Sequence, residues 1–217
     1  MMRTRPKPVI SQEDLILDII IEYLGDNRTF HLNKIIPYIH SRISKSTTNI
    51  NIDGIKKNLN LLLKKKFIVE GSKLTRDTVL DTPNRKILHD FIKNNPGYYL
   101  NNILDNVEIS KYVVYFHIEV LLKFGLIKSD IIENHEVYFD PSMSLDEVLP
   151  FYYKSKKKSR LILNYLREDN IGHTRTHLSG KLNIHSTTLK KYLDILEKYG
   201  FVIKEIFSNK VLYFLSD

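Results

Sequence analysis

The stretch Ser186–Phe214, STTLKKYLDILEKYGFVIKEIFSNKVLYF, decides the fold that we predict for this chain. Three leucines in its first half recur at the spacing i, i+4 and i+7, which predicts an amphipathic helix with one apolar face. Gly200 suits the left-handed residue that commonly ends a helix. Two β-rich segments then flank a turn at Ser208–Asn209. The order helix, glycine, strand, turn, strand is that of the second half of a winged helix-turn-helix.

The same unit occurs once more, 75 residues earlier in the chain. Ser110–Phe139 aligns with the stretch above, and Phe124–Ile127 matches Tyr199–Val202. The match continues upstream, where residues 85–109 align with residues 160–184. Self-similarity over the length of a small domain predicts two copies of one fold.

A third and more diverged copy precedes these two. Its expected elements are two helices, a polar loop, a third helix and a short wing. Their ranges are Ser11 or Gln12 to Leu24, Leu32–Ser44 with Pro37 bending or shortening it, the loop Ser44–Ile52, a helix opening at Asp53, and strands at Phe67–Val69 and Ser72–Thr75. Ser11 is the expected cap of the first helix, because serine readily accepts a bond from the first turn.

We therefore expect a mainly α protein of α+β class, built from three tandem winged helix-turn-helix domains. The first, residues 1–79, is the diverged copy and carries a basic amino-terminal arm with Arg3, Arg5 and Lys7. Residues 80–140 form the second domain, residues 141–159 a linker with a basic run, and residues 160–217 the third domain.

Composition excludes several classes of protein. The chain has no cysteine, so disulfides and thiolate metal sites are not available to it. No apolar run approaches the roughly 20 residues that a membrane span needs, and the basic, proline-containing amino terminus is not a secretory signal. We expect a soluble, cytoplasmic protein. The abundance of Ile, Asn, Lys and Tyr is typical of an AT-rich genome.

Charge is distributed unevenly along the chain, whose net charge is +8. Residues 1–79 carry a net charge of +6, residues 80–150 carry −5, and residues 151–217 carry +7. Double-stranded DNA attracts basic surfaces and repels acidic ones. We therefore expect the outer domains to contact DNA and the middle domain to act as a spacer or a protein contact.

The candidate DNA-binding residues lie on the expected recognition helices and wing, where Lys, Ser, Thr and Asn can reach phosphates and base edges. The alternative is that they are ordinary solvated side chains on the outer face of a packed helix. The candidates are Lys56, Lys57, Asn60 and Lys64 in the first domain, and Arg175, Ser186, Thr187, Lys190, Lys191, Asn209 and Lys210 in the third.

The corresponding helix of the middle domain carries aromatic residues instead. Tyr112 and Tyr115 are expected on its surface, where they suit a homodimer or another protein partner, whereas Phe116 is expected in the core. Its wing tip, Glu133–Glu136, is acidic and would be repelled by phosphates.

Catalytic and metal sites are not indicated. His173 and His177 are one helical turn apart and His185 is close in sequence, a spacing that could bind a metal, but a role as polar residues near DNA is the preferred interpretation. The chain has no glycine-rich phosphate loop, no HExxH and no GxSxG. We expect no enzymatic activity, no metal and no cofactor.

The middle copy resembles a known family. Arg85-x-Ile87-Leu88, Asn95-Pro96-Gly97, Ile109-Ser110, His117-Ile118, Leu122 and Phe124–Ile127, preceded by Gly71–Arg76, look like the pattern of archaeal winged helix-turn-helix transcription regulators related to the MarR and ArsR groups. The resemblance covers residues 80–139 and 160–214 well and residues 12–75 by layout. It implies sequence-specific DNA binding and transcriptional control.

A second resemblance implies a different function. Tandem winged helices also build the ESCRT-II subunits and some subunits associated with RNA polymerase, in which the fold serves protein contacts. The leading hypothesis is a DNA-binding transcription regulator, and the alternative is a protein-assembly subunit.

Overall fold

The structure is a computed structural model that describes residues 11–26, 28–45, 50–169 and 171–216. The described residues fall into two compact units, one within Met1–His89 plus Ile109–Leu126 and the other within Asp90–Glu108 plus Ile127–Asp217. They are mostly helical with two small sheets, as the α+β prediction requires. The predicted basic arm with Arg3, Arg5 and Lys7 lies outside the described residues, as does part of the loop at 46–49.

The first unit begins with three helices around one apolar core. They are α1 (Gln12–Gly25), α2 (Leu32–Ile43) and α3 (Ile52–Lys64). Each buries one stripe of isoleucines or leucines, which is the pattern of an amphipathic helix. The hydroxyl of Ser11 accepts a bond from the Asp14 backbone N–H at 3.1 Å, so the predicted cap is confirmed. α3 begins one residue before the predicted Asp53 and is capped by the side chain of Asn51.

The predicted wing of this unit is reduced to one antiparallel bridge. Phe67–Val69 and Ser72–Thr75 form no strand pair, and a single bridge joins Ile68 to Thr75. The backbone N–H of Gly71 donates to the carbonyl of Phe30 at 2.7 Å, and the Phe30 N–H donates to Ser72 at 2.9 Å. The turn between the expected strands therefore bonds to the loop before α2, and the pairing of the two expected strands is limited to this one bridge.

The first unit also contains the short 3₁₀ helix η1 (Val79–Asp81), the start of α4 (Pro83–Asn94) and α6 (Lys111–Lys123). The expectation that Phe116 is a core residue is wrong: its side chain is 61% exposed, whereas His117 is only 6% exposed. Val114, His117, Ile118 and Leu121 form the buried stripe of α6, and Phe116 lies on the opposite side of the helix. Helical spacing outweighed hydrophobicity at this position.

The second unit contains a three-stranded antiparallel sheet with the order β1-β3-β2. Its strands are β1 (Tyr98–Tyr99), β2 (Lys128–Ile132) and β3 (His135–Phe139), and α5 (Leu100–Leu104) follows β1. The segment predicted as a linker contains α7 (Leu145–Ser155), which begins with a capping box at Ser144 and Glu147. Val148 and Tyr152 of α7 pack against the apolar face of the sheet, so this helix covers the wing strands.

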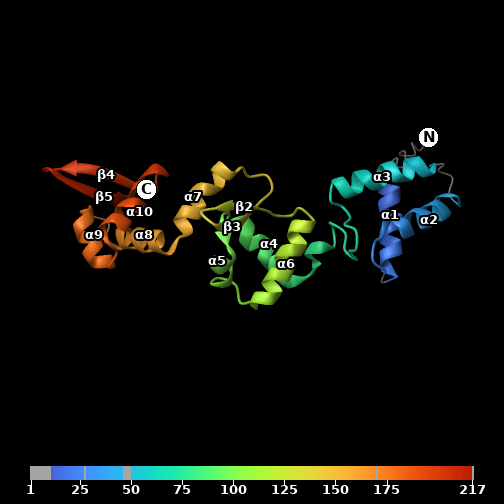
Figure 1. Cartoon of the computed structure of the whole chain (residues 1–217), viewed down its shortest axis with the longest axis horizontal. Helices are drawn as coiled ribbons and strands as arrows, with labels where there is room; N and C mark the ends of the chain where they lie inside the picture. Colours follow the sequence, from blue (N-terminus) through green and yellow to red (C-terminus); the bar gives the residue numbers. More distant parts are fainter. Residues whose placement is uncertain (1–10, 27, 46–49, 170, 217) are drawn as a thin grey trace, which may run out of the picture. The chain divides into compact units, whose positions relative to one another are not determined.

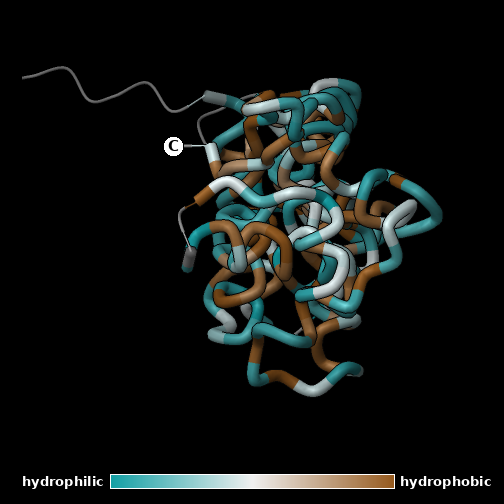
Figure 2. The backbone as a smooth tube through the Cα atoms, turned by 90° about the vertical axis from the view of Figure 1, so that its left-hand side faces the viewer, coloured by the Kyte–Doolittle hydropathy of each residue, from teal (hydrophilic) through white to brown (hydrophobic). Residues whose placement is uncertain are grey.

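The remaining part of the second unit is α8 (Lys157–Asp169), α9 (Arg175–Leu182), α10 (Ser186–Lys198) and a hairpin of β4 (Val202–Phe207) and β5 (Lys210–Leu215) (Figure 1). Leucines from the three helices share one core with Val202 and Tyr213 of the hairpin. Figure 2 shows hydrophobic and hydrophilic stretches alternating along the coils of the backbone, as expected of helices with one buried face.

The 75-residue repeat seen in the sequence is also present in the backbone. α6 and α10 are related by this shift at both ends, and so are the positive φ angles of Gly125 and Gly200. The turns of the two hairpins use paired left-handed residues at the same offset, Glu133 and Asn134 in one and Ser208 and Asn209 in the other. Even the pairing of β1 with β3 recurs, because Tyr98 pairs with Tyr138 and His173 with Tyr213.

We expect Gly97→Ala to destabilise the protein more than Gly200→Ala. Both glycines have positive φ, 81° and 74°, so both substitutions carry a left-handed strain of about 1 kcal/mol. A β-carbon at residue 97 would also lie 2.9 Å from Val148 Cγ1 and 3.1 Å from the Tyr152 backbone nitrogen, whereas one at residue 200 would meet nothing within 4 Å. The additional loss is about 1–3 kcal/mol, measured by denaturant unfolding. Equal losses would show that α7 does not pack against this turn.

The buried His117 makes stability depend on pH. Burial lowers its pKa, and the nearby Arg85 guanidinium lowers it further. The folded state therefore binds this proton less well than the unfolded state. The contribution of His117 to the free energy of unfolding is fully present above a pH of about 6.5 and is lost as the pH decreases below it. We expect His117→Gln to flatten the decline in unfolding free energy between about pH 7 and pH 5. His40→Gln, which replaces an exposed histidine, is the control, and an unchanged profile for His117→Gln would contradict the assignment.

Candidate nucleic-acid interface

The exposed face of α10 presents the residues predicted for the third recognition helix. Leu189, Leu193 and Leu196 are buried and fix the opposite face of α10 in the core. Ser186 is partly exposed, and Thr187, Lys190 and Lys191 are exposed. The hydroxyl of Thr187 lies 2.9 Å from Nδ1 of His185, the residue that precedes the helix. The four predicted side chains therefore share one solvent-facing surface.

Two further predicted sites flank this helix. Arg175 is the first residue of α9 and is exposed. Asn209 and Lys210 lie at the turn of the β4–β5 hairpin and are exposed as well. The pKa of Lys190 is raised, chiefly by its hydrogen bond to Asp194, while Arg175 is near enough for its charge to act in the opposite direction. Arg175 and Lys190 therefore act on each other electrostatically.

Carboxylates close to both lysines were missed by sequence reasoning. Lys190 Nζ donates to Asp194 Oδ2 at 2.7 Å, and both side chains are exposed. Lys191 Nζ lies 3.9 Å from Oε1 of Glu133 in the β2–β3 turn. The spacing i, i+4 on a helix could have identified the first pair, but no local signal indicates the second. DNA phosphates would have to compete with these carboxylates for the lysines.

Glu133 is the centre of a small cluster within the second unit. It accepts hydrogen bonds from Lys156, the residue between α7 and α8, and from the hydroxyl of Tyr153 at 3.3 Å. The bond from Lys156 is the main reason that the pKa of Glu133 is lowered. Tyr153 in turn stacks on Tyr199 at the end of α10, with ring centroids 5.6 Å apart. The tip predicted as an acidic wing is therefore engaged by side chains of its own chain.

In the first unit, α3 presents a separate basic face. Lys56, Lys57, Asn60 and Lys64 are all exposed and fall on one side of the helix, because they are spaced i, i+1, i+4 and i+8. Ile55, Leu59 and Leu62 on the other side are buried. Within the described part of the chain, none of these three lysines forms an ion pair. Their charges are therefore more available to an anionic partner than those of α10.

The face of α6 is aromatic. Tyr112 is 87% exposed, and Tyr115 and Phe116 are exposed beside it. Lys111 Nζ lies 6.0 Å from the centre of the Tyr115 ring. This surface offers apolar contact area with little positive charge, in contrast to α3 and α10.

The histidines considered for metal binding are placed differently from a ligand set. The rings of His173 and His177 stack at 4.8 Å with an interplanar angle of 9°, and His177 Nε2 lies 2.9 Å from the hydroxyl of Tyr165. His173 is buried, and its backbone pairs with Tyr213. The described residues contain no group of three or more metal-ligating side chains. None of the helices in the described ranges has the length and hydrophobicity needed to cross a bilayer.

Comparison with known proteins gives one informative similarity. No family model matches the chain. The chain is 26% identical over 144 residues to a protein of Methanocaldococcus jannaschii named as an uncharacterized HTH-type transcriptional regulator. The match covers 66% of this chain and 36% of that protein, so the chain spans about a third of the length of the relative that it matches.

Proposed function

We propose that this chain is a DNA-binding transcription regulator built from three tandem winged helix-turn-helix domains, at residues 1–79, 80–140 and 160–217. The repeated order of helices and hairpin supports the proposal, as does the similarity to a protein named as an HTH-type transcriptional regulator. Such a protein acts in the cytoplasm and needs neither a catalytic centre nor a cofactor.

The observation that carries the proposal is the pair of exposed, basic helix faces. α3 offers Lys56, Lys57 and Lys64 on one face together with Asn60, and α10 offers Lys190 and Lys191 together with Thr187. A helix fits the major groove of DNA, where lysines reach phosphates and Asn or Thr reach base edges. The first and third domains would contact DNA in this way. Arg175 and the turn at Asn209–Lys210 would reach the DNA backbone beside α10.

The middle domain, residues 80–140, has a different role in this proposal. Its α6 is aromatic where the outer helices are basic, and Glu133 at its hairpin turn is bonded to Lys156 and Tyr153. An acidic surface would be repelled by phosphates. This domain would act as a spacer before the third domain, or as a contact for a second copy or another protein.

The salt dependence of duplex binding tests which helix faces contact phosphates. We expect the combined substitution of Lys56, Lys57 and Lys64 by Ala to reduce the slope of log K against log salt by about three, because three phosphates are no longer neutralised. Lys190→Glu with Lys191→Glu should weaken binding through α10. The control replaces the exposed Lys86, Lys93 and Lys123 by Ala, which removes the same charge from the middle segment.

If the α3 variant retains the wild-type slope, the first domain does not contact the duplex. A slope reduced equally by the control would show that net charge alone determines binding. Selection of duplexes from a random pool shows whether the protein reads sequence, and the absence of an enriched motif would contradict the role of regulator.

We expect Asp194→Asn to tighten duplex binding. Asp194 pairs with Lys190 on the proposed DNA-facing surface, so the substitution frees the lysine and removes a charge that repels phosphates. The change in affinity should be several-fold, because an exposed helical pair contributes only about 0.3–0.5 kcal/mol and the removed repulsion adds to it. Glu168→Gln on α8 is the matched control. A neutral or weaker result for Asp194→Asn would place this face of α10 away from DNA.

A second function has one observation in its favour. The exposed Tyr112, Tyr115 and Phe116 of α6 suit a protein partner, because interfaces are enriched in aromatic residues. The chain would then be an assembly subunit whose winged helices bind proteins. Motif-free, weak duplex binding together with specific loss of a partner in Tyr112→Ser would favour this alternative.

A further inference from the structure

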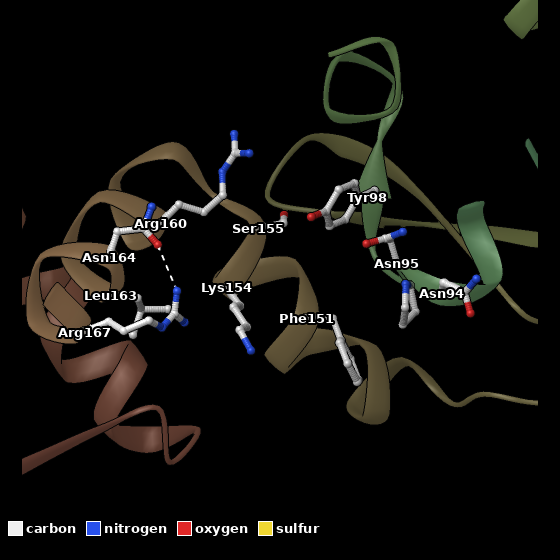
Figure 3. A pocket seen from close by; sticks show the side chains of 11 residues that line it. Asn94, Asn95, Tyr98, Phe151, Lys154, Ser155, Arg160, Leu163, Asn164 and Arg167 are labelled. Carbon is white, nitrogen blue, oxygen red and sulfur yellow. Dashed lines mark hydrogen bonds between the residues drawn. The ribbon is translucent and has the colours of Figure 1, made fainter. Parts of the chain in front are cut away.

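A cavity lies over the connection between α7 and α8 in the second unit. It has a volume of about 370 Å³, and we call it the α7–α8 cavity. Its lining comes from the turn between α4 and β1, from the end of α7 and from α8 (Figure 3). Figure 3 shows the side chains of α8 on one side, those of the turn on the other, and Lys154 and Ser155 between them.

Positive charge is concentrated in this cavity. Lys154, Arg160 and Arg167 line it, and no carboxylate is found among the described residues that do so. Arg167 donates to the neutral amide oxygen of Asn164 at 3.3 Å, and Lys154 Nζ lies 4.9 Å from the ring of Phe201. Within the described ranges, none of the three cations forms an ion pair. Three uncompensated cations around one hollow favour an anion with more than one charge, and the planar arginine forks suit phosphate.

The opposite wall provides flat and polar surfaces. Tyr98, Phe151 and Pro96 offer apolar faces, and Asn94 and Asn95 offer amides. The Asn95 amide nitrogen donates to the carbonyl of Phe91 at 2.9 Å, which leaves its side-chain oxygen as an acceptor. An aromatic ring with polar edges could stack and form hydrogen bonds here. Charge on one side and aromatic surface on the other fit a molecule that joins a phosphate to a flat ring.

The size of the hollow favours a small molecule over a nucleic acid duplex. Small-molecule sites typically have volumes of about 300–1,000 Å³ and combine an apolar lining with a few polar groups. A duplex contacts exposed ridges such as the outer face of α10 and cannot enter such a hollow. A smaller hollow lined by Gly200, Phe201 and Leu215 shares Lys154, Leu163 and Arg167 with the cavity.

We propose that the α7–α8 cavity binds a small ligand of the nucleotide class, with its phosphate at Arg160, Arg167 and Lys154 and its base against Tyr98 and Phe151. The ligand would touch helices on both sides of Lys156, the single residue that separates them. This binding does not depend on the proposed function, because no residue of the cavity lies on the predicted DNA-contacting helices.

The test measures binding of AMP and GMP to the full chain without DNA, by melting temperature and by calorimetry. Inorganic phosphate and adenosine are measured alongside, and each should bind more weakly than a nucleotide because each fills only one side of the cavity. At least one nucleotide should raise the melting temperature, since a ligand that binds only the folded state stabilises it. Arg160→Gln with Arg167→Gln should weaken nucleotide binding about tenfold or more, because charge-assisted hydrogen bonds to phosphate are removed.

Two further variants distinguish a specific nucleotide site from nonspecific attraction by positive charge. Arg28→Gln removes an exposed arginine outside the cavity and should bind nucleotide like the wild type. Phe151→Ala should weaken nucleotide binding while leaving the response to inorganic phosphate unchanged. The proposal is overturned if neither nucleotide binds, or if the double variant binds as well as the wild type. It is also overturned if the double variant loses duplex DNA binding and nucleotides have no effect, since the cations would then belong to the DNA-binding surface.

Discussion

The close approach of α7 to the turn at Gly97 is the contact on which the second unit depends. A β-carbon at Gly97 would lie 3.1 Å from the backbone nitrogen of Tyr152, so the helix lies close against the turn. In this position Val148 and Tyr152 cover the wing sheet, and Tyr153 and Lys156 reach Glu133. The same placement brings Phe151, Lys154 and Ser155 into the lining of the α7–α8 cavity together with Tyr98. One glycine therefore determines how a sheet, a helix and a cavity fit together.

Much of this architecture could be predicted from the sequence, because its signals are local or repetitive. The stop at Gly200 and the turn at Ser208–Asn209 follow from backbone geometry, which only a few residue types tolerate. The shift of 75 residues relates α6 to α10 in the sequence as it does in the backbone. Exposure of the basic residues on α3 and α10 follows from helical spacing once the buried leucines are identified.

Other features depend on contacts between distant residues, and the sequence carries no signal for them. Gly71 and Ser72 bond to Phe30, and the predicted hairpin is reduced to one bridge; no local pattern indicates these bonds. The proximity of Glu133 to Lys191 joins residues from different parts of the repeat. Phe116 is a separate case, because its residue type predicts a core position whereas helical spacing predicts the exposed position that the structure shows. The cavity, too, is lined by segments that only the packing of α7 brings together.

The connection between α7 and α8 has a mechanical consequence. Lys156 is the single extended residue between the two helices, with φ −62° and ψ 139°. A helix of 13 residues is about 20 Å long, so a rotation of about 30° at this one residue would swing the far end of α8 by about 10 Å. The hydrogen bond from Lys156 to Glu133 ties this residue to the β2–β3 turn, so one side chain would oppose such a rotation.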